Sequence, residues 1–144
     1  IIVVRGEQKM AYWLIKSEPN VWSWDQQVAK GNEGEAWTGV KNYLARNNMR
    51  AMKLGDKAFF YHSNIGKEIV GICEVCQEIF PDPTDEKWEC VKFRAVEKLK
   101  RPYTLEEAKN NPKLANMALV KMTRLSVQPV TDEEWKEVLQ EVGQ

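Results

Sequence analysis

Hydrophobic residues form short runs or alternate with polar residues along several stretches of the chain, a pattern typical of β-strands. Such stretches occupy residues 12–15, the residues that lead to His62, and residues 69–79, 88–99 and 125–127. The stretch at residues 69–79 begins with apolar side chains on both faces, which favours a closed or strongly curled sheet. Pro19, Pro102 and Pro129 follow three of the stretches and lack the N–H of a strand ladder, so we expect the strands to end there.

Helices are predicted where a capping box precedes a run with helical periodicity, because a Ser or Thr and a Gln or Glu three residues later cap each other's backbone N–H groups. Three such boxes begin at Ser23, Thr104 and Thr131. A further helix is predicted over about residues 42–53, where Ala45, Met49 and Met52 form an apolar stripe. Pro112 suits the first position of another helical turn. The elements predict an α+β domain with five or six strands curled toward a barrel.

Length and composition fit one globular domain. The chain has 144 residues, of which 43% are hydrophobic, and its mean hydropathy is −0.54. It contains no apolar run near the roughly 18 residues of a membrane-spanning helix, so we expect no membrane partner. We interpret residues 1–9 as an extension that precedes a natural start at Met10, and residues 10–144 as the domain. The expected location is the cytoplasm, or the nucleus if the source is eukaryotic.

The three cysteines predict neither disulfides nor a metal site. An odd number cannot pair completely, and a chain of this size does not need disulfide bonds. Cys73 and Cys76 have the spacing of a zinc-binding pair, but residues three apart on a strand point to opposite faces. Neither a second pair nor a suitably spaced histidine completes the ligand set. We therefore predict no metal and no cofactor.

Charge is balanced in total and segregated along the chain. The sequence has 21 basic and 21 acidic residues. Residues 38–55 contain Lys41, Arg46, Arg50 and Lys53 and no acid. A second basic region comprises Lys98, Lys100, Arg101, Lys121 and Arg124. Acidic residues gather at positions 82–89 and 132–141. One face of the molecule can therefore be positive although the net charge is zero.

Candidate chemistry lies where aromatic and hydrogen-bonding residues adjoin. Tyr61, His62 (the only histidine) and Ser63 meet where a strand turns toward the next, a place where polar groups can line a cleft. The alternative is a hairpin with a hydrogen-bonded structural histidine. Two further segments, residues 13–19 and 37–43, combine the same residue types. A nucleobase needs this combination, because rings stack on its faces and polar groups read its edge.

At these segments the sequence resembles the EVE domain family of the PUA-like superfamily. The matching motifs are Tyr-Trp-Leu-Ile-Lys-Ser-Glu-Pro at 12–19, Trp-Thr-Gly-Val-Lys-Asn-Tyr at 37–43, Phe-Tyr-His-Ser-Asn at 60–64 and Leu-Ser-Val-Gln-Pro-Val at 125–130. The resemblance extends over about residues 10–143. It implies a PUA-like curled mixed sheet or pseudo-barrel with peripheral helices, and binding of nucleic acid with modified bases, modified cytosine in DNA above all. Lys41 departs from the arginine expected in the family, which weakens a bidentate contact there.

The resemblance implies a base pocket and a phosphate-binding face. The predicted pocket residues are Lys16, Ser17, Glu18, Trp22, Trp37, Val40, Asn42, Tyr43, Tyr61, His62 and Ser63. Trp22 and Trp37 are expected to stack on the base. Ser17, Asn42 and Ser63 are expected to read its edge. Lys41, Arg46, Arg50 and Lys53 are the predicted phosphate contacts, which give affinity without sequence information.

Two other functions remain open at this stage. An RNA-binding module would use the same pocket for a base from a single strand or loop. An enzyme would need an acid and a base, for which Glu18 and His62 are the candidates. His62 and Ser63 are adjacent on a strand and point apart, so they do not form a nucleophile and base pair. We therefore predict a monomeric, non-catalytic nucleic-acid-binding protein, in which Trp13 and Trp135 belong to the core.

Overall fold

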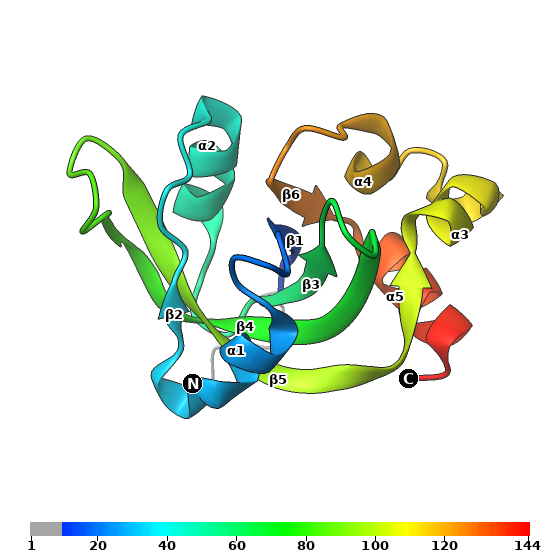
Figure 1. Cartoon of the computed structure of the whole chain (residues 1–144). Coiled ribbons are helices and arrows are strands. Elements are labelled where there is room, and N and C mark those ends of the chain that lie inside the picture. Colours follow the sequence, from blue (N-terminus) through cyan, green and yellow to red (C-terminus); the bar gives the residue numbers. More distant parts are fainter. Residues whose placement is uncertain (1–9) are drawn as a thin grey trace, which may run out of the picture.

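One curled, six-stranded mixed sheet forms the centre of the molecule, as the computed structural model shows for residues 10–144 (Figure 1). Its strands are β1 (Tyr12–Ser17), β2 (Glu35–Ala36), β3 (Lys57–His62), β4 (Glu68–Pro81), β5 (Glu89–Thr104) and β6 (Val127–Val130). Their order across the sheet is β2-β5-β4-β3-β1-β6, in which only the β1–β3 pair is parallel. The predicted α+β class and curled mixed sheet are confirmed. The predicted extension at residues 1–9 lies outside the described residues.

Strand alternation divides the apolar side chains between the two faces of the sheet. On β1, Ile15 belongs to one buried cluster and Leu14 to the other, and on β3 Phe60 and Phe59 divide in the same way. All four are fully buried. Because both faces of the central strands carry apolar side chains, both must be covered by other elements.

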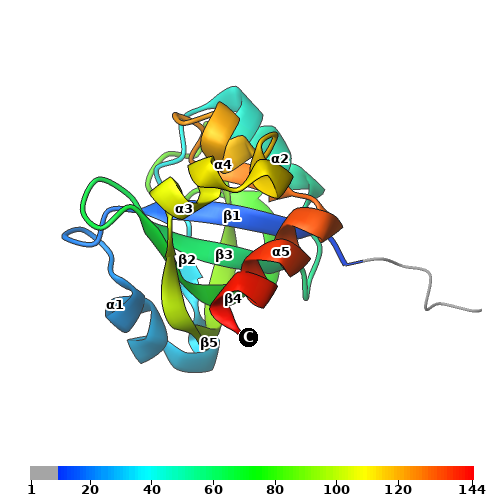
Figure 2. The same ribbon diagram turned by 90° about the vertical axis from the view of Figure 1, so that its right-hand side faces the viewer.

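The helices cover these two faces separately. They are α1 (Trp24–Ala29), α2 (Tyr43–Ala51), α3 (Leu105–Asn110), α4 (Ala118–Lys121) and α5 (Asp132–Val142), with 3₁₀ turns at Gly31–Glu33 and Pro112–Leu114. The first two contribute to the Phe60 cluster and the last three to the Phe59 cluster. Figures 1 and 2 show α3, α4 and α5 together on one side of the sheet. None of the helices in residues 10–144 has the length and apolar content to cross a membrane.

Local capping interactions agree with the sequence. All three capping boxes form, at Ser23, Thr104 and Thr131. Asn42 caps α2, because its Oδ1 accepts the N–H of Ala45 at 2.9 Å. Pro112 is the first residue of a 3₁₀ turn. Trp13 and Trp135 are buried, as predicted.

Strand ends differ from the sequence expectation at two prolines. β5 continues through Pro102 to Thr104, and β6 includes Pro129. Pro129 lies on the edge strand β6, which has no neighbour on one side. Pro102 lies at the end of β5, beyond the residues near Phe93 that pair with the short β2. Neither proline therefore needs an N–H to bond a strand on that side. The prediction that these two strands end at proline was therefore wrong, because both strands continue past it. The two-residue β2 was not predicted, because it is too short to show periodicity.

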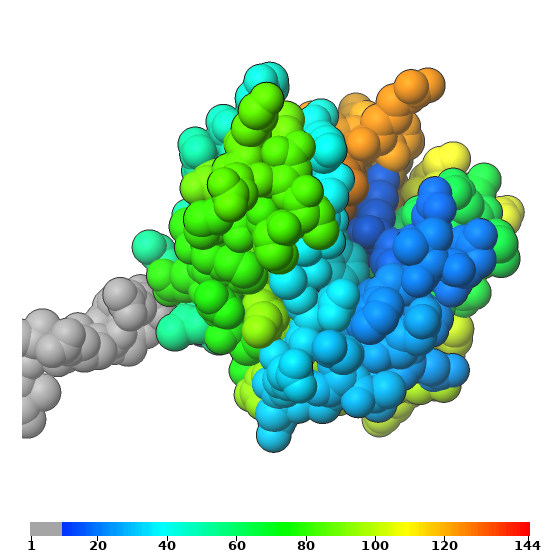
Figure 3. Space-filling model, turned by 60° about the vertical axis from the view of Figure 1, so that its left-hand side comes forward, coloured from blue at the N-terminus to red at the C-terminus, as the bar shows by residue number. Residues whose placement is uncertain are grey.

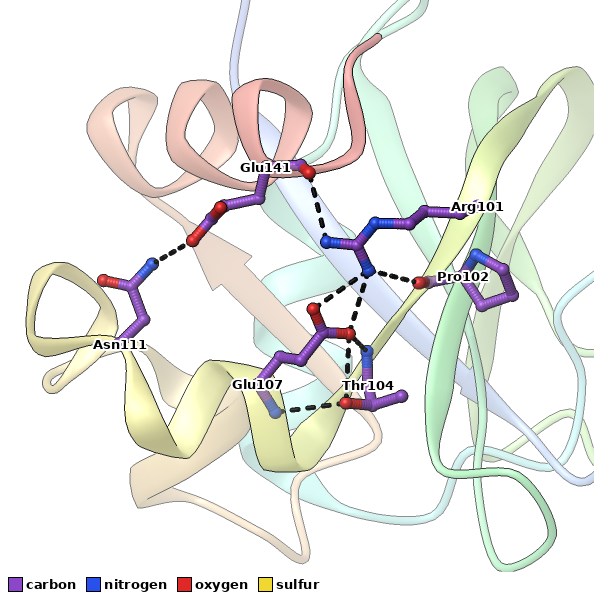
Figure 4. Close-up of polar contacts among 6 residues, drawn as sticks. All are labelled: Arg101, Pro102, Thr104, Glu107, Asn111 and Glu141. Carbon is purple, nitrogen blue, oxygen red and sulfur yellow. Dashed lines mark hydrogen bonds and ion pairs between the residues drawn. The ribbon is translucent and has the colours of Figure 1, made fainter.

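Polar contacts at the end of β5 join this strand to α3 and α5 (Figure 4). The guanidinium of Arg101 lies 2.9 Å from a carboxylate oxygen of Glu107 and donates to the main-chain oxygen of Glu141 at 3.1 Å. Glu107 also accepts the N–H of Thr104 as part of the α3 capping box. Asn111 donates to Glu141 at 3.1 Å. Arg101, predicted as part of a basic region, is thus paired with an acid.

The packing of α1 against β4 generates a first prediction. A Cβ placed on Gly71 would lie 2.4 Å from the Trp24 ring, which is itself buried. We expect Gly71→Ala to lower the free energy of unfolding by about 1–3 kcal/mol, the usual cost of overpacking. Chemical denaturation measures this change. The control is Trp24→Phe, which removes the outer part of the indole. If the clash is the cause, the double variant should lose less stability than the sum of the two single variants. Losses of unfolding free energy that simply add would contradict the clash.

Candidate functional site

A cleft of about 500 Å³ opens where β1 ends, between that strand and the segment that leads into α2. Figure 3 shows the surface hollowed between the cyan segment before α2 and the orange segment before β6, with blue β1 residues deep between them. We call it the aromatic cleft. It is lined by Lys16, Ser17, Glu18, Val21, Trp22, Glu35, Ala36, Trp37, Thr38, Gly39, Val40, Lys41 and Ser126. Its volume is in the range of small-ligand pockets.

Trp37 forms the most deeply buried aromatic part of the cleft. Its side chain is 8% exposed and packs edge-on against Phe60 and Phe93, with ring centroids 5.8 and 5.6 Å apart. The backbone N–H of Trp37 donates to the carbonyl of Val91 at 2.8 Å. The ring therefore belongs to the core and to the cleft at once, so its position is fixed by packing before any ligand binds.

Trp22 lines the cleft from the loop before α1 and is half-buried. Its indole N–H donates to Oε1 of Gln27 at 2.8 Å, and the buried Gln27 amide donates to the carbonyl of Phe93 at 3.0 Å. The Ser17 hydroxyl donates to the carbonyl of Trp22 at 2.5 Å. These contacts fix both the indole ring and the backbone carbonyl of Trp22. The hydroxyl of Ser17, predicted to read a base edge, is therefore committed to positioning Trp22.

The segment 37–41 is held by a buried carboxylate. Asp82 accepts the N–H of Gly39 at 2.8 Å, at a residue whose φ of 77° suits glycine. Burial by itself raises the pKa of Asp82, but hydrogen bonds from Thr84 and from backbone N–H groups outweigh it and hold the pKa below its usual value. The carboxylate is thus kept ionised, and it anchors the segment to the loop between β4 and β5.

The turn after β3 fixes the other side of the cleft. Ser63 donates its N–H to the carbonyl of Ser17 at 2.9 Å. Asn64, which has a φ of 65°, donates to Oε1 of Glu18 at 2.6 Å. One oxygen of the Glu18 carboxylate is thereby occupied, and the side chain is oriented along the cleft edge.

His62 acts as a cap for α1. Its Nε2 accepts the N–H of Trp24, the first residue of the helix, at 3.1 Å. Accepting requires an unprotonated Nε2. Burial lowers the pKa of His62, although Glu68 and Asp25 act in the opposite direction. The neutral form is thus favoured, which fits the structural alternative left open by the sequence.

The predicted pocket residues separate into two groups. Six of them line the aromatic cleft: Lys16, Ser17, Glu18, Trp22, Trp37 and Val40, and Lys41 joins them. Asn42, Tyr43, Tyr61, His62 and Ser63 do not. Asn42 is used in capping α2, and Ser63 lies in the turn that holds β1. Tyr61 is buried in the cluster on the opposite face of the sheet, where burial raises its pKa to about 12. These five residues thus do not line the aromatic cleft, and a role for them in binding a base stays a prediction.

Tyr43 lies outside the cleft, on the exposed side of α2. It is 67% exposed and its ring lies 5.1 Å from that of Trp88 in the β4–β5 hairpin. The guanidinium of Arg46 lies 5.0 Å from the Tyr43 ring and 5.9 Å from the Trp88 ring. Such stacking of a cation over rings is favourable. Arg46 is therefore partly covered by aromatic rings.

The predicted phosphate-binding face of α2 is partly neutralised by acids from elsewhere in the chain. Lys41 lies 3.4 Å from Asp85, and Arg50 pairs with Glu89. The acids at positions 82–89 were recognised in the sequence, but their proximity to α2 follows from the hairpin that carries them. Lys53 is exposed and forms no ion pair within residues 10–144. The role of these four residues stays a prediction.

The sequence reasoning missed several residues of the site. Val21, Glu35, Ala36, Thr38, Gly39 and Ser126 line the cleft without having been selected. Thr38, Gly39 and Ser126 stand inside motifs already noted, so motif membership could have included them. Gln27 and Asp82 act through hydrogen bonds to residues far away in the chain: Gln27 donates to the carbonyl of Phe93, and Asp82 accepts the N–H of Gly39. Only the position of Asp82 between two prolines distinguishes it in the sequence.

A metal centre is not formed by residues 10–144, in which no three His, Cys, Asp or Glu side chains are grouped to hold an ion. Cys73 is buried in the Phe60 cluster and Cys76 is only partly buried. Burial is the main cause that raises the pKa of both thiols.

Comparison with known proteins gives one consistent family. The model of the EVE domain matches residues 11–141. Mouse thymocyte nuclear protein 1 is 37% identical, over 93% of this chain and 74% of the relative. The crystal structure of a protein from Agrobacterium tumefaciens is 60% identical, with a TM-score of 0.91 and coverage of 92% and 93% of the two chains. Human THYN1 in complex with DNA containing 5-methylcytosine is 34% identical, with a TM-score of 0.84 and coverage of 93% and 98%.

The His62 cap generates a prediction on pH. The pKa of His62 is lower in the folded protein than the ordinary 6.5, so the unfolded chain binds the proton more readily and stability falls as the pH drops below about 6.5. We expect the thermal midpoint to fall between about pH 7.5 and pH 5.5, above the range in which most carboxylates titrate. The His62→Gln variant keeps an uncharged hydrogen-bond acceptor, so its thermal midpoint is expected to fall less over the same pH range. Equal falls in both proteins would contradict the role of His62.

Proposed function

The chain belongs to the EVE domain family, and we propose that it is a non-catalytic reader of modified bases in DNA, with 5-methylcytosine as the favoured ligand. The observation that carries the proposal is the human relative THYN1, which shares this fold and is in complex with DNA that contains 5-methylcytosine. The aromatic cleft is the site we assign to the base. We take residues 10–144 as the domain that binds.

The apolar side of the cleft supports recognition of a methylated base. Trp37 and Val40 are buried around it, and Trp22 adds a half-buried ring. A methyl group in contact with such a surface contributes about 1–3 kcal/mol of discrimination in a well-fitted pocket. That gain requires the base to be held firmly, and the hydrogen bonds that fix Trp22 and the packing that fixes Trp37 supply the rigidity.

The polar side of the cleft supports recognition of a cytosine edge. The exocyclic amino group of cytosine is a hydrogen-bond donor, for which a carboxylate is a suitable acceptor. Glu18 and Glu35 both line the cleft. Glu18 keeps one carboxylate oxygen beyond the one bound to Asn64, and Glu35 lies 3.6 Å from the ammonium of Lys30. A base inside a duplex cannot reach such a concave site, so the base enters flipped out or from a single strand.

A non-catalytic role fits the arrangement of the two residues that an enzyme would need. Glu18 lines the cleft, whereas His62 does not, and Nε2 of His62 is occupied by the N–H of Trp24. The two groups therefore do not face a shared ligand as an acid and base pair. The mouse relative is named a nuclear protein, which accords with the nuclear location expected for a eukaryotic source; the location of this chain stays a prediction.

Replacement of a cleft tryptophan tests this function. Trp37→Ala would empty part of the core and cost about 3–5 kcal/mol of stability, so Trp22→Ala is the sharper variant because Trp22 is only half-buried. We expect it to remove the preference for 5-methylcytosine over cytosine, since a lost stacking face costs about 1–3 kcal/mol per base. The measurement is a titration of oligonucleotides that differ at one cytosine, as duplex DNA, single-stranded DNA and RNA.

The matched control is Trp88→Ala, which removes another half-buried tryptophan from outside the cleft and should keep the preference. If the wild-type protein binds methylated and unmethylated DNA equally, the proposed function is wrong. If Trp22→Ala retains the preference, the base binds elsewhere. Tighter binding of the matched RNA would favour an RNA-binding module instead.

A further inference from the structure

A second hollow, which we call the basic groove, lies beside the aromatic cleft. It has a volume of about 360 Å³ and is lined by Asn42, Leu44, Lys121, Met122, Thr123, Arg124 and Leu125. Its residues come from the N-cap and start of α2, from the last residue of α4 (Lys121) and from the segment between α4 and β6.

The basic groove is joined to the cleft by direct contacts. Lys16, which lines the cleft, donates its ammonium to the carbonyl of Thr123 at 2.7 Å. The N–H of Lys16 donates to the carbonyl of Ser126, which also lines the cleft, at 3.0 Å. Arg124 is two residues from Ser126, so their Cα atoms are at most about 8 Å apart. A nucleotide strand that places a base in the cleft would therefore pass close to the groove.

The cations of the groove have no acidic partner in the described part of the chain, in contrast to two of the cations at α2 and just before it. Lys121 and Arg124 are exposed and form no ion pair within residues 10–144. Lys41 and Arg50, in contrast, are paired with Asp85 and Glu89. Arg46 is covered by aromatic rings. Besides Lys16 within the cleft, whose ammonium donates to Thr123, positive charge without an acidic partner among the described residues thus lies next to the cleft at Lys121 and Arg124.

We propose that Lys121 and Arg124 bind the phosphodiester backbone of the strand whose base occupies the aromatic cleft. This inference rests on the proposed function, and it assigns the phosphate contacts to the segment before β6 in place of the outer face of α2. Lysine and arginine bind phosphates by charge, and arginine adds paired donors. Such contacts position the strand and carry no information on the modification of the base.

The test compares the salt dependence of binding in two double variants. Lys121→Gln with Arg124→Gln removes both charges of the groove. Lys109→Gln with Lys136→Gln removes two exposed charges from α3 and α5, which line neither the basic groove nor the aromatic cleft. For duplex DNA, each lost phosphate contact flattens the plot of log K against log salt by about 0.9. We expect a slope reduced by about 1.8 for the groove variant and unchanged for the control.

The groove variant should also bind methylated and unmethylated DNA more weakly by the same factor, so that the ratio of the two affinities is kept. Its thermal midpoint should equal that of the wild type, because both side chains are exposed. An unchanged slope would overturn the inference, as would an equal change in the control. A flattened slope only in an Arg46, Arg50 and Lys53 variant would place the phosphates on α2. A wild-type protein without base preference would refute the proposed function alone, since the slope is measured independently.

Discussion

The ring of Phe60, fully buried on the central strand β3, is packed by three aromatic rings, two of which come from distant parts of the chain. Trp24 of α1 lies 5.4 Å away, Trp37 lies 5.8 Å away and His62 lies 5.6 Å away, all in edge-to-face geometry. Edge-to-face packing adds stability beyond area burial and fixes the angle between rings. The position of the cleft relative to the sheet depends on this cluster.

Around that cluster, polar groups that are buried or, for His62, half-buried position the loops that carry the cleft. Gln27, Asp82 and His62 each accept or donate a hydrogen bond at a place where a segment leaves the sheet or begins a helix. Unpaired polar groups would be costly there, so each contact restricts the loop to one conformation. The result is a set of loops held on a rigid scaffold, the usual location of binding residues.

Charge is organised by the same fold. The net charge is zero, yet the β4–β5 hairpin places Asp85 and Glu89 against Lys41 and Arg50. Surface pairs of this kind are weak, with a median near zero to about 1 kcal/mol, and they are screened by salt. They offset the charge of Lys41 and Arg50, whereas Lys121 and Arg124 of the basic groove form no ion pair within residues 10–144.

Local interactions explain what the sequence determined by itself. Alternation and apolar runs located five strands, and the three capping boxes located helix starts, because each depends on residues within one turn or one pleat. Of the residues predicted for a base pocket, Lys16, Ser17, Glu18, Trp22, Trp37 and Val40 line the cleft. Tertiary structure alone decided that Tyr61 faces the opposite cluster, that Ser63 holds β1 through the carbonyl of Ser17, and which acids pair with Lys41 and Arg50. These outcomes depend on which residues far apart in the chain become neighbours, such as Arg50 and Glu89, 39 positions apart, and the pattern within one strand or helix does not specify those pairs.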